Sequence, residues 1–165
     1  MKHATTALPL LSLLEAGALF GFFYAWVCST MWGLDAADPR VAIEAMQAMN
    51  ASVRNGAFAP FFFGAPLVLL LAGAVLYFTG QRVPAMLFGA AGLIVLFGSV
   101  VLTMAINVPM NAELAMVEVP GDEEAARAIW QDYSPTWQFW NQMRTLASGL
   151  GFALALVGLV SMKSA

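Results

Sequence analysis

The residues best suited to chemistry lie in the stretch 134–144 (SPTWQFWNQMR), which leads into a long apolar segment. At 3.6 residues per turn, four of these side chains share one helix face: Trp137, Trp140, Asn141 and Arg144. Such a face can stack on a flat ring and donate hydrogen bonds to an oxygen atom. An arginine next to lipid-compatible sequence is costly unless groups inside the protein receive it. The sequence therefore predicts that other helices supply a receiver for Arg144.

A second polar stretch, Asn107-Val108-Pro109-Met110-Asn111, ends another apolar segment and is called the NVPMN segment below. Its two asparagines are four residues apart, and Pro109 between them interrupts a regular helical hydrogen-bond ladder. The asparagines can satisfy backbone groups that the proline leaves free. They can equally present their carboxamides to a bound ligand. Both interpretations stay open at the level of sequence.

A third polar set, Gln47, Asn50 and Arg54, recurs at three- and four-residue spacing along one side of an amphipathic segment. The set either forms a solvated face at a membrane surface or turns inward over the other helices. The spacing fits both arrangements, so this alternative also stays open.

The composition identifies the elements that must position these residues. The chain has 165 residues, of which 61% are hydrophobic and only 10% charged, and its mean hydropathy is +0.76. Soluble domains carry roughly 25% charged residues, so this is the composition of a membrane protein. We predict one all-α domain over residues 1–165, an integral membrane four-helix bundle with helical outer connections. The expected spans are about 7–32, 57–78, 83–108 and 137–162.

The outer connections carry helix-start signals. Asp38-Pro39 predicts the start of an amphipathic helix over about 39–55, with Asp38 as the N-cap and proline in the first turn. Ser134-Pro135 repeats the device and predicts the start of the fourth helix. A separate short helix is expected over about 122–133, where Glu123 and Glu124 suit the positive end of a helix dipole.

The first span has a rival interpretation as a secretory signal peptide. Lys2 precedes the apolar residues 8–14, and Ala16-Gly17-Ala18 resembles a small-residue cleavage site. The apolar character nevertheless resumes through Trp26 and Val27, which gives a segment long enough to span a membrane. We therefore expect this segment to be retained.

Several classes of function are excluded by what the chain contains. One cysteine, Cys28, rules out an intrachain disulfide and a multi-thiolate metal site, and one histidine, His3, rules out a bis-histidine haem within the chain. The net charge is −3 and no Lys/Arg patch is present to neutralise phosphates, so no nucleic-acid partner is expected. We expect no metal and no cofactor. Membrane lipid is the expected surrounding.

The basic residues set the predicted topology. Lys2, Arg82 and Lys163 lie in the segments of one side, which holds no acid, whereas nine acids accompany the arginines of the other side. Positive charge in the short segments predicts cytoplasmic termini, in a bacterial inner membrane. This topology gathers the polar residues at the outer end of the bundle: Asn50, Arg54, Asn107, Asn111, Trp137, Asn141 and Arg144. Glu15 lies nearer the inner end, too far along the axis to pair with Arg144, and is either protonated or bonded to a neighbour such as Ser12.

The sequence resembles the DUF1772, or anthrone oxygenase-like, family of small four-span membrane proteins. The resemblance rests on residues 46–50 (MQAMN), on Asn55 with 60–64 (PFFFG), on 107–114 (NVPMNAEL) and on 137–145 (WQFWNQMRT), which occur in the family's order. It implies the four-span fold over essentially the whole chain. Some members convert an anthrone to the anthraquinone with O₂ and without a known metal or flavin, whereas most bacterial members have no established activity. The resemblance therefore supports the fold more strongly than it supports a function.

The implied chemistry can be set against these residues. Oxidising an anthrone begins with loss of a benzylic proton, which gives an electron-rich anthrolate that can pass an electron to O₂. We expect Trp137 and Trp140 to stack on an aromatic or quinol-like substrate, with Asn50 and Arg54 as further contacts. The residues expected to stabilise the oxyanion are Arg144, Asn141 and one of Asn107 and Asn111. No base is evident, since His3 lies at the wrong end and Glu113 is only the nearest carboxylate in sequence, and this counts against an enzyme.

The alternative is a purely structural polar cluster. Arg144 would then bond the carbonyls freed around Pro109 and the carboxamides of the NVPMN segment, and the tryptophans would be interfacial anchors. The chain would be a non-catalytic membrane protein or an accessory subunit. Its small-residue faces would pack against a second copy or a partner in a membrane complex, through Gly17, Gly21, Gly89, Gly149 and Gly151. A transporter is the weakest interpretation, because no inverted repeat is visible.

Overall fold

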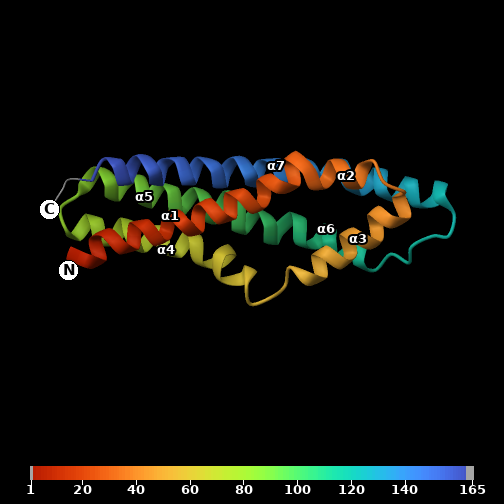
Figure 1. Ribbon diagram of the computed structural model, residues 1–165, viewed down its shortest axis with the longest axis horizontal. Coiled ribbons are helices and arrows are strands. Elements are labelled where there is room, and N and C mark those ends of the chain that lie inside the picture. The colour runs from red at the N-terminus through yellow and green to blue at the C-terminus, as the bar shows by residue number, and fades with distance from the viewer. Residues whose placement is uncertain (1, 163–165) are drawn as a thin grey trace.

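The computed structural model describes residues 2–162, with side chains from residue 7, and shows an all-α rod (Figure 1). The first column of the rod comprises α1 (Lys2–Ala25), the π-helical turn η1 (Trp26–Thr30) and α2 (Met31–Asp35). Next come α3 (Pro39–Ser52) and α4 (Phe58–Phe78). The third span follows as α5 (Arg82–Val95), the π-helical turns η2 (Leu96–Val101) and η3 (Thr103–Asn107), and α6 (Val108–Ala115). The last helix is α7 (Glu123–Val160).

Four helices are long and apolar enough to cross a membrane, as the sequence predicts: Ala7–Asp35, Phe58–Phe78, Arg82–Ala115 and Glu123–Val160. The shortest, α4, has 21 residues, or about 31 Å at 1.5 Å per residue, which matches the hydrocarbon thickness of a bilayer. The other three continue beyond it. We call the part of the rod beyond α4 the extension. There α3 lies alongside the other three helices, in the place that α4 occupies in the bundle (Figure 1). A four-helix cross-section is thus kept on both sides of the α3–α4 junction.

The predicted start of α3 is confirmed and the predicted start of the last helix is wrong. Asp38 caps α3 by accepting a hydrogen bond from the Arg40 amide (2.9 Å). The final helix, however, begins at Glu123 with Asp122 as its cap and runs without interruption through Pro135. The segment expected as a short helix over about 122–133 is therefore the first part of α7. Pro135 removes one backbone hydrogen bond, and side-chain bonds to Asp35 described below hold α7 on both sides of it.

The third span also continues past its predicted end at Val108, because α6 carries the helix through Pro109 to Ala115. The regular ladder is nevertheless interrupted, as the proline predicts. It gives way to two π-helical turns, η2 and η3, of which η3 ends two residues before Pro109. Such turns shift the hydrogen bonds by one residue and rotate the following side chains.

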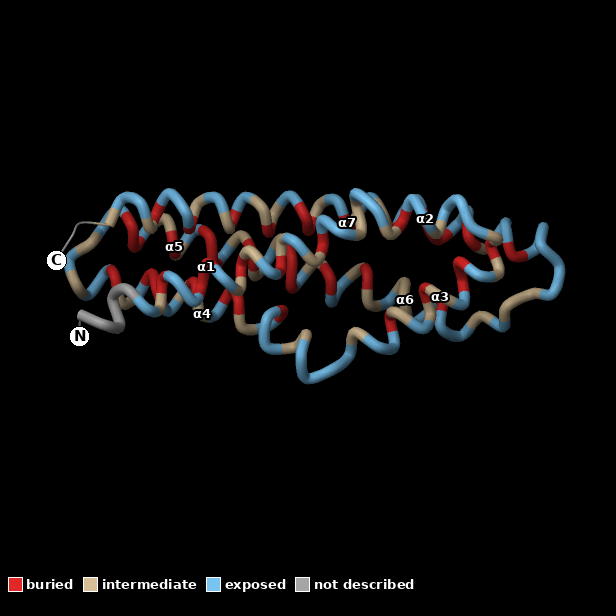
Figure 2. The backbone as a smooth tube through the Cα atoms, in the orientation of Figure 1, coloured by how far each residue is buried: buried red, intermediate tan, exposed pale blue. Residues whose placement is uncertain are grey.

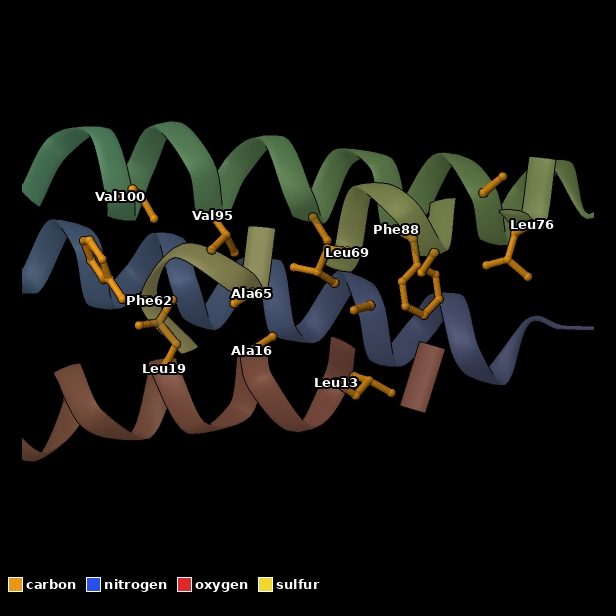
Figure 3. Close-up of a cluster of buried hydrophobic side chains, with 14 of the residues drawn as sticks. Leu13, Ala16, Leu19, Phe62, Ala65, Leu69, Leu76, Phe88, Val95 and Val100 are labelled. Atoms are coloured by element: carbon orange, nitrogen blue, oxygen red, sulfur yellow. The ribbon is translucent and has the colours of Figure 1, made fainter. Parts of the chain in front are cut away.

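Two apolar clusters hold the rod together. The bundle interior is filled by residues such as Leu19, Leu69, Phe88 and Val95 (Figure 3). The extension has its own cluster, which includes Met31, Ile43, Met46, Trp130 and Trp137. Exposed residues occur along the whole rod (Figure 2), and in the bundle they include large apolar ones such as Leu14, Leu67, Leu93 and Leu146. An apolar outer surface is what lipid requires.

Close helix contacts inside the chain use most of the glycines that the sequence offers for partner contacts. A Cβ on Gly151 would lie 2.5 Å from Val95 Cγ2, and one on Gly149 would lie 2.9 Å from the Phe20 ring. Gly17 packs against Phe152, and Gly89 lies against Gly73. A Cβ on Gly21 or on Gly89 would meet open space, but the backbone nitrogen of Gly89 lies 3.0 Å from the position of a Cβ on Gly73. These small residues therefore serve packing within the chain.

Candidate ligand-binding site

A cavity of about 500 Å³ lies at the junction where α3 ends and α4 begins. Apolar side chains supply most of its wall, and the aromatic ones among them come from α1, η1, α4 and α7. The polar lining residues are few and come from α3, the 53–57 loop, the third span and α7. The main lining residues are Phe22, Phe23, Trp26, Asn50, Arg54, Asn55, Phe58, Phe62, Phe63, Thr103, Asn111, Trp137 and Arg144.

Arg144 lies in the wall of this cavity with only 5% of its surface exposed. Its Nε donates to Asn141 Oδ1 (3.0 Å) and its Nη1 to Thr103 Oγ1 (3.2 Å). The guanidinium carbon also lies 4.5 Å from the centre of the Phe23 ring and 5.0 Å from that of Trp137, both within cation–π range. Among the described residues no carboxylate pairs with it. Arg144 is thus a buried cation without a counter-ion.

The receiver predicted for Arg144 is wrong in its residues. The NVPMN asparagines do not bond the guanidinium, which is instead held by Thr103, one turn earlier in the third span, and by its own helix. The reason is that both asparagines are engaged elsewhere. Asn111 bonds side chains of α7 and α3, and Asn107 Nδ2 donates to the Trp137 carbonyl (3.5 Å).

Asn111 is the node that joins three parts of the chain. Its Oδ1 accepts hydrogen bonds from Trp137 Nε1 and Tyr133 Oη, both at 2.8 Å. Its Nδ2 donates to Asn50 Oδ1 at 3.0 Å. The third span, α7 and α3 therefore meet at one carboxamide beside the cavity, and Asn50 Nδ2 is left buried without a partner in the described structure.

The structure brings five of the eight predicted site residues to the cavity: Asn50, Arg54, Asn111, Trp137 and Arg144. The other three lie outside its lining. Asn141 stands behind Arg144, with its Nδ2 donating to the Phe23 carbonyl (3.4 Å), and Asn107 stands behind Trp137. Trp140 packs edge-on against Phe139 instead (centroids 5.1 Å apart). Of the two tryptophans predicted for the site, Trp137 lines the cavity and Trp140 does not.

Several lining residues are ones that the sequence analysis does not assign to the site. Phe22, Phe23 and Trp26 come from the first span, and Phe58, Phe62 and Phe63 come from the start of α4. The runs of aromatic residues in 20–26 and 61–63 are visible in the sequence. They look like ordinary span residues, because the face that a transmembrane helix turns inward depends on its neighbours.

Hydrogen bonds in the extension hold the cavity's polar side in place. The Asp35 carboxylate accepts from Trp130 Nε1 (2.9 Å), Ser134 Oγ (2.7 Å) and Gln138 Nε2 (2.8 Å), which fixes the end of α2 on α7. Gln47 Nε2 donates to the carbonyls of Leu114 and Val117, which fixes α3 on the end of α6. Gln47 and Asn50 therefore face inward.

Charged residues near the cavity differ in their surroundings. Arg54 is exposed, lines the cavity and has no acidic partner among the described residues. At the other end of α3, the Arg40 side chain bonds Asp38 and lowers the pKa of that carboxyl to about 2. Glu15 faces Gly64 of α4, and Ser12 bonds the Pro9 carbonyl. Ser12 is therefore not the partner of Glu15.

Fold and cavity together define a class: a four-helix membrane-spanning protein with an aromatic-walled cavity around a buried arginine. A family model described as anthrone oxygenase matches residues 57–154, more than half of the chain. The protein belongs to this family, as its sequence motifs predict. The match covers the NVPMN segment, Trp137 and Arg144. Comparison with curated proteins and with solved structures found no match for this chain.

Proposed function

We propose that this protein binds a flat aromatic molecule carrying a phenolic, enolic or quinone oxygen, and that it oxygenates an anthrone-like substrate without a cofactor. The observation that carries the proposal is Arg144, a buried cation without a counter-ion in the wall of an aromatic cavity. The cavity volume of about 500 Å³ is in the range that encloses a small organic ligand. An oxyanion on such a ligand would supply the missing negative charge.

The reaction places few demands on the protein. The CH₂ group of the anthrone loses two hydrogens and gains one oxygen atom from O₂, and the second oxygen atom leaves as water. The first step is loss of a CH₂ proton, which puts negative charge on the ring oxygen. The N–H groups of the Arg144 guanidinium would stabilise that charge in the low-dielectric cavity. The anthrolate is then electron-rich enough to reduce O₂ directly.

The proton needs an acceptor, and no carboxylate or imidazole is among the residues that line the cavity in the described structure. In this proposal the acceptor is water or hydroxide admitted on the Arg54 side, where the loop 53–57 is exposed. Stabilisation of the oxyanion therefore has to provide most of the rate acceleration.

The test is anthraquinone formation and O₂ uptake by the protein in lipid nanodiscs supplied with anthrone, above the rate in empty nanodiscs. We expect Arg144→Met to lower the catalysed rate by about a hundredfold or more, the usual effect of removing an oxyanion donor. Trp140→Phe is the matched control on the same helix and should retain the rate. A wild-type rate equal to that of empty nanodiscs would refute the enzymatic part.

The second candidate is a protein that binds such a molecule without transforming it, and the lack of a base among the lining residues favours it. In that case wild-type protein would bind anthrone and anthraquinone, Arg144→Met would weaken the binding, and O₂ uptake would match empty nanodiscs. Both candidate functions use the same cavity, and the measurement of O₂ uptake distinguishes them.

A further inference from the structure

We infer that the ligand carries a hydrocarbon chain, which lies in a second cavity that continues the first one toward the lipid-facing surface between α1 and α4. The inference rests on the proposed function and specifies the class of ligand. This class is a flat ring with an oxygen near Arg144 and an alkyl or polyprenyl chain attached to the ring. The first cavity then binds the ring and the second binds the chain.

The second cavity has a volume of about 500 Å³, like the first, and the two cavities are neighbours. Six side chains line both spaces, so no further layer of protein lies between them. The shared residues are Phe22, Trp26, Met49, Val53, Asn55 and Phe58. The ring centroids of Phe22 and Phe58 are 4.8 Å apart. In the proposed complex the chain passes beside these two rings.

The second cavity reaches the surface that faces lipid. Ala18 of α1 and Phe61 of α4 line it but not the first cavity, and both are exposed residues of membrane-spanning helices. α1 and α4 lie side by side (Figure 1). Phe61 is three residues after Phe58, where α4 starts, or about 4.5 Å along the helix at 1.5 Å per residue. A chain that leaves the cavity here enters the hydrocarbon layer of the bilayer.

The hydroxyl and carboxamide groups that line the second cavity already bond the backbone. Ser52 Oγ donates to a carbonyl one turn earlier (3.0 Å), and Asn55 Nδ2 donates to the Ser52 carbonyl (2.6 Å). Asn55 Oδ1 accepts from the amides of Ala57 and Phe58. The other lining residues are apolar, apart from the indole of Trp26, which borders both cavities. A hydrocarbon chain, which needs no hydrogen bonds, fits such a lining.

The first cavity differs from the second in its charge. Arg144 and Arg54 line the first cavity and not the second. The guanidinium of Arg144 also keeps N–H groups beyond the two that bond Asn141 and Thr103. An oxygen-bearing ring is therefore bound in the first cavity and an apolar chain in the second. The two cavities together match the two ends of one amphiphilic ligand.

The experiment compares two probes that differ only in their chain, 2-hydroxy-3-methyl-1,4-naphthoquinone and its 3-dodecyl analogue. Both are flat, coloured ring systems with an enolic oxygen. Binding to the full-length protein in phosphatidylcholine nanodiscs is measured by absorbance after capture of the discs, and the amount in empty nanodiscs is subtracted. We expect the wild type to bind both probes. Arg144→Met should weaken both by a similar factor, because both share the ring oxygen.

Three variants test the second cavity. Ala18 and Ala57 line it from opposite sides and do not line the first cavity, so a tryptophan at either position occupies the space of the chain. Ala18→Trp and Ala57→Trp should each weaken binding of the dodecyl probe by about fivefold or more and that of the methyl probe by less than about twofold. Ala25→Trp places the same side chain on an exposed residue of α1 outside both linings. It should leave the ratio of the two affinities unchanged.

The outcomes separate the chain site from the proposed function. Failure of the wild type to bind either probe would refute the proposed function and the chain site with it. Binding of the methyl probe alone would overturn the chain site only. An unchanged ratio in Ala18→Trp and Ala57→Trp, as expected if lipid alone fills the second cavity, would also overturn it, and so would an equal effect of Ala25→Trp. Binding of the methyl probe shows that a variant is folded, and if Ala18→Trp does not fold, Ala57→Trp decides.

Discussion

Arg144 contributes to the free energy of unfolding in two opposing ways. Burial of a cation without a counter-ion is unfavourable, whereas the bonds to Asn141 and Thr103 and the rings of Phe23 and Trp137 are favourable. A residue kept only for stability would more simply be apolar at this depth. The unused N–H groups of Arg144 beside a cavity therefore point to a ligand.

This balance gives a prediction for Arg144→Met. Relief of the desolvation penalty should offset the lost hydrogen bonds, so the free energy of unfolding should change by no more than about 1 kcal/mol while ligand binding is lost. Unfolding in mixed micelles, measured alongside binding of anthrone, checks both parts. A loss of about 3–5 kcal/mol would instead support the purely structural interpretation of the cluster.

At the scale of elements, glycines decide how closely the helices pack. Gly151 of α7 lies against Val95 and the backbone of α5, whereas Gly21 of α1 has open space around it. Both are helical glycines with similar intrinsic effects on helix stability, so they form a matched pair.

We predict that Gly151→Ala destabilises the bundle by about 1–3 kcal/mol, because its Cβ would lie 2.5 Å from Val95 Cγ2 and 3.2 Å from the Ala91 carbonyl oxygen. Gly21→Ala should be neutral or stabilising by a few tenths of a kcal/mol up to about 1 kcal/mol. Thermal unfolding of both variants in one detergent is the measurement. Similar effects of the two substitutions would contradict the packing of α5 against α7.

The cap of α3 should respond to acid. Because Arg40 lowers the pKa of Asp38 to about 2 in the folded chain, below the ordinary value of about 4, the ionised cap stabilises α3 fully above about pH 4. This contribution is lost as the pH falls through about 2. Hydrogen exchange in α3, corrected for the intrinsic pH dependence, should show protection falling between these values. In Asp38→Asn the same pH interval should leave the protection of α3 unchanged.

At the scale of the whole molecule, the α3–α4 junction sets the position of the cavity. α4 has the length of one membrane crossing, so the junction lies where that crossing ends, and the polar residues gather there. The starts of α1 and α5 and the ends of α4 and α7 lie at the opposite end of the rod (Figure 1). A ligand soluble in lipid would meet the cavity at one boundary of the bilayer.

Orientation remains a prediction from charge. Because Lys2, Arg82 and Lys163 belong to the short segments of one predicted side, we expect both termini in the cytoplasm. A fluorescent protein fused to the C-terminus should fluoresce, and a periplasm-dependent phosphatase fused there should be inactive. A phosphatase inserted at Gly121, between α6 and α7, should be active. The reverse pattern would place the cavity on the cytoplasmic side.

The sequence by itself determines the four spans, the cap of α3, the family and most of the polar residues at the site. These follow from composition, periodicity and local helix signals, which act within a few residues. The tertiary structure decides that α7 runs through Pro135, because Asp35, a hundred residues away in sequence, accepts bonds on both sides of the proline. It also decides that Arg144 bonds Thr103 and that Trp137, rather than Trp140, faces the cavity. Helix rotation and the π-helical turns set these pairings, and both depend on packing between helices rather than on any local pattern.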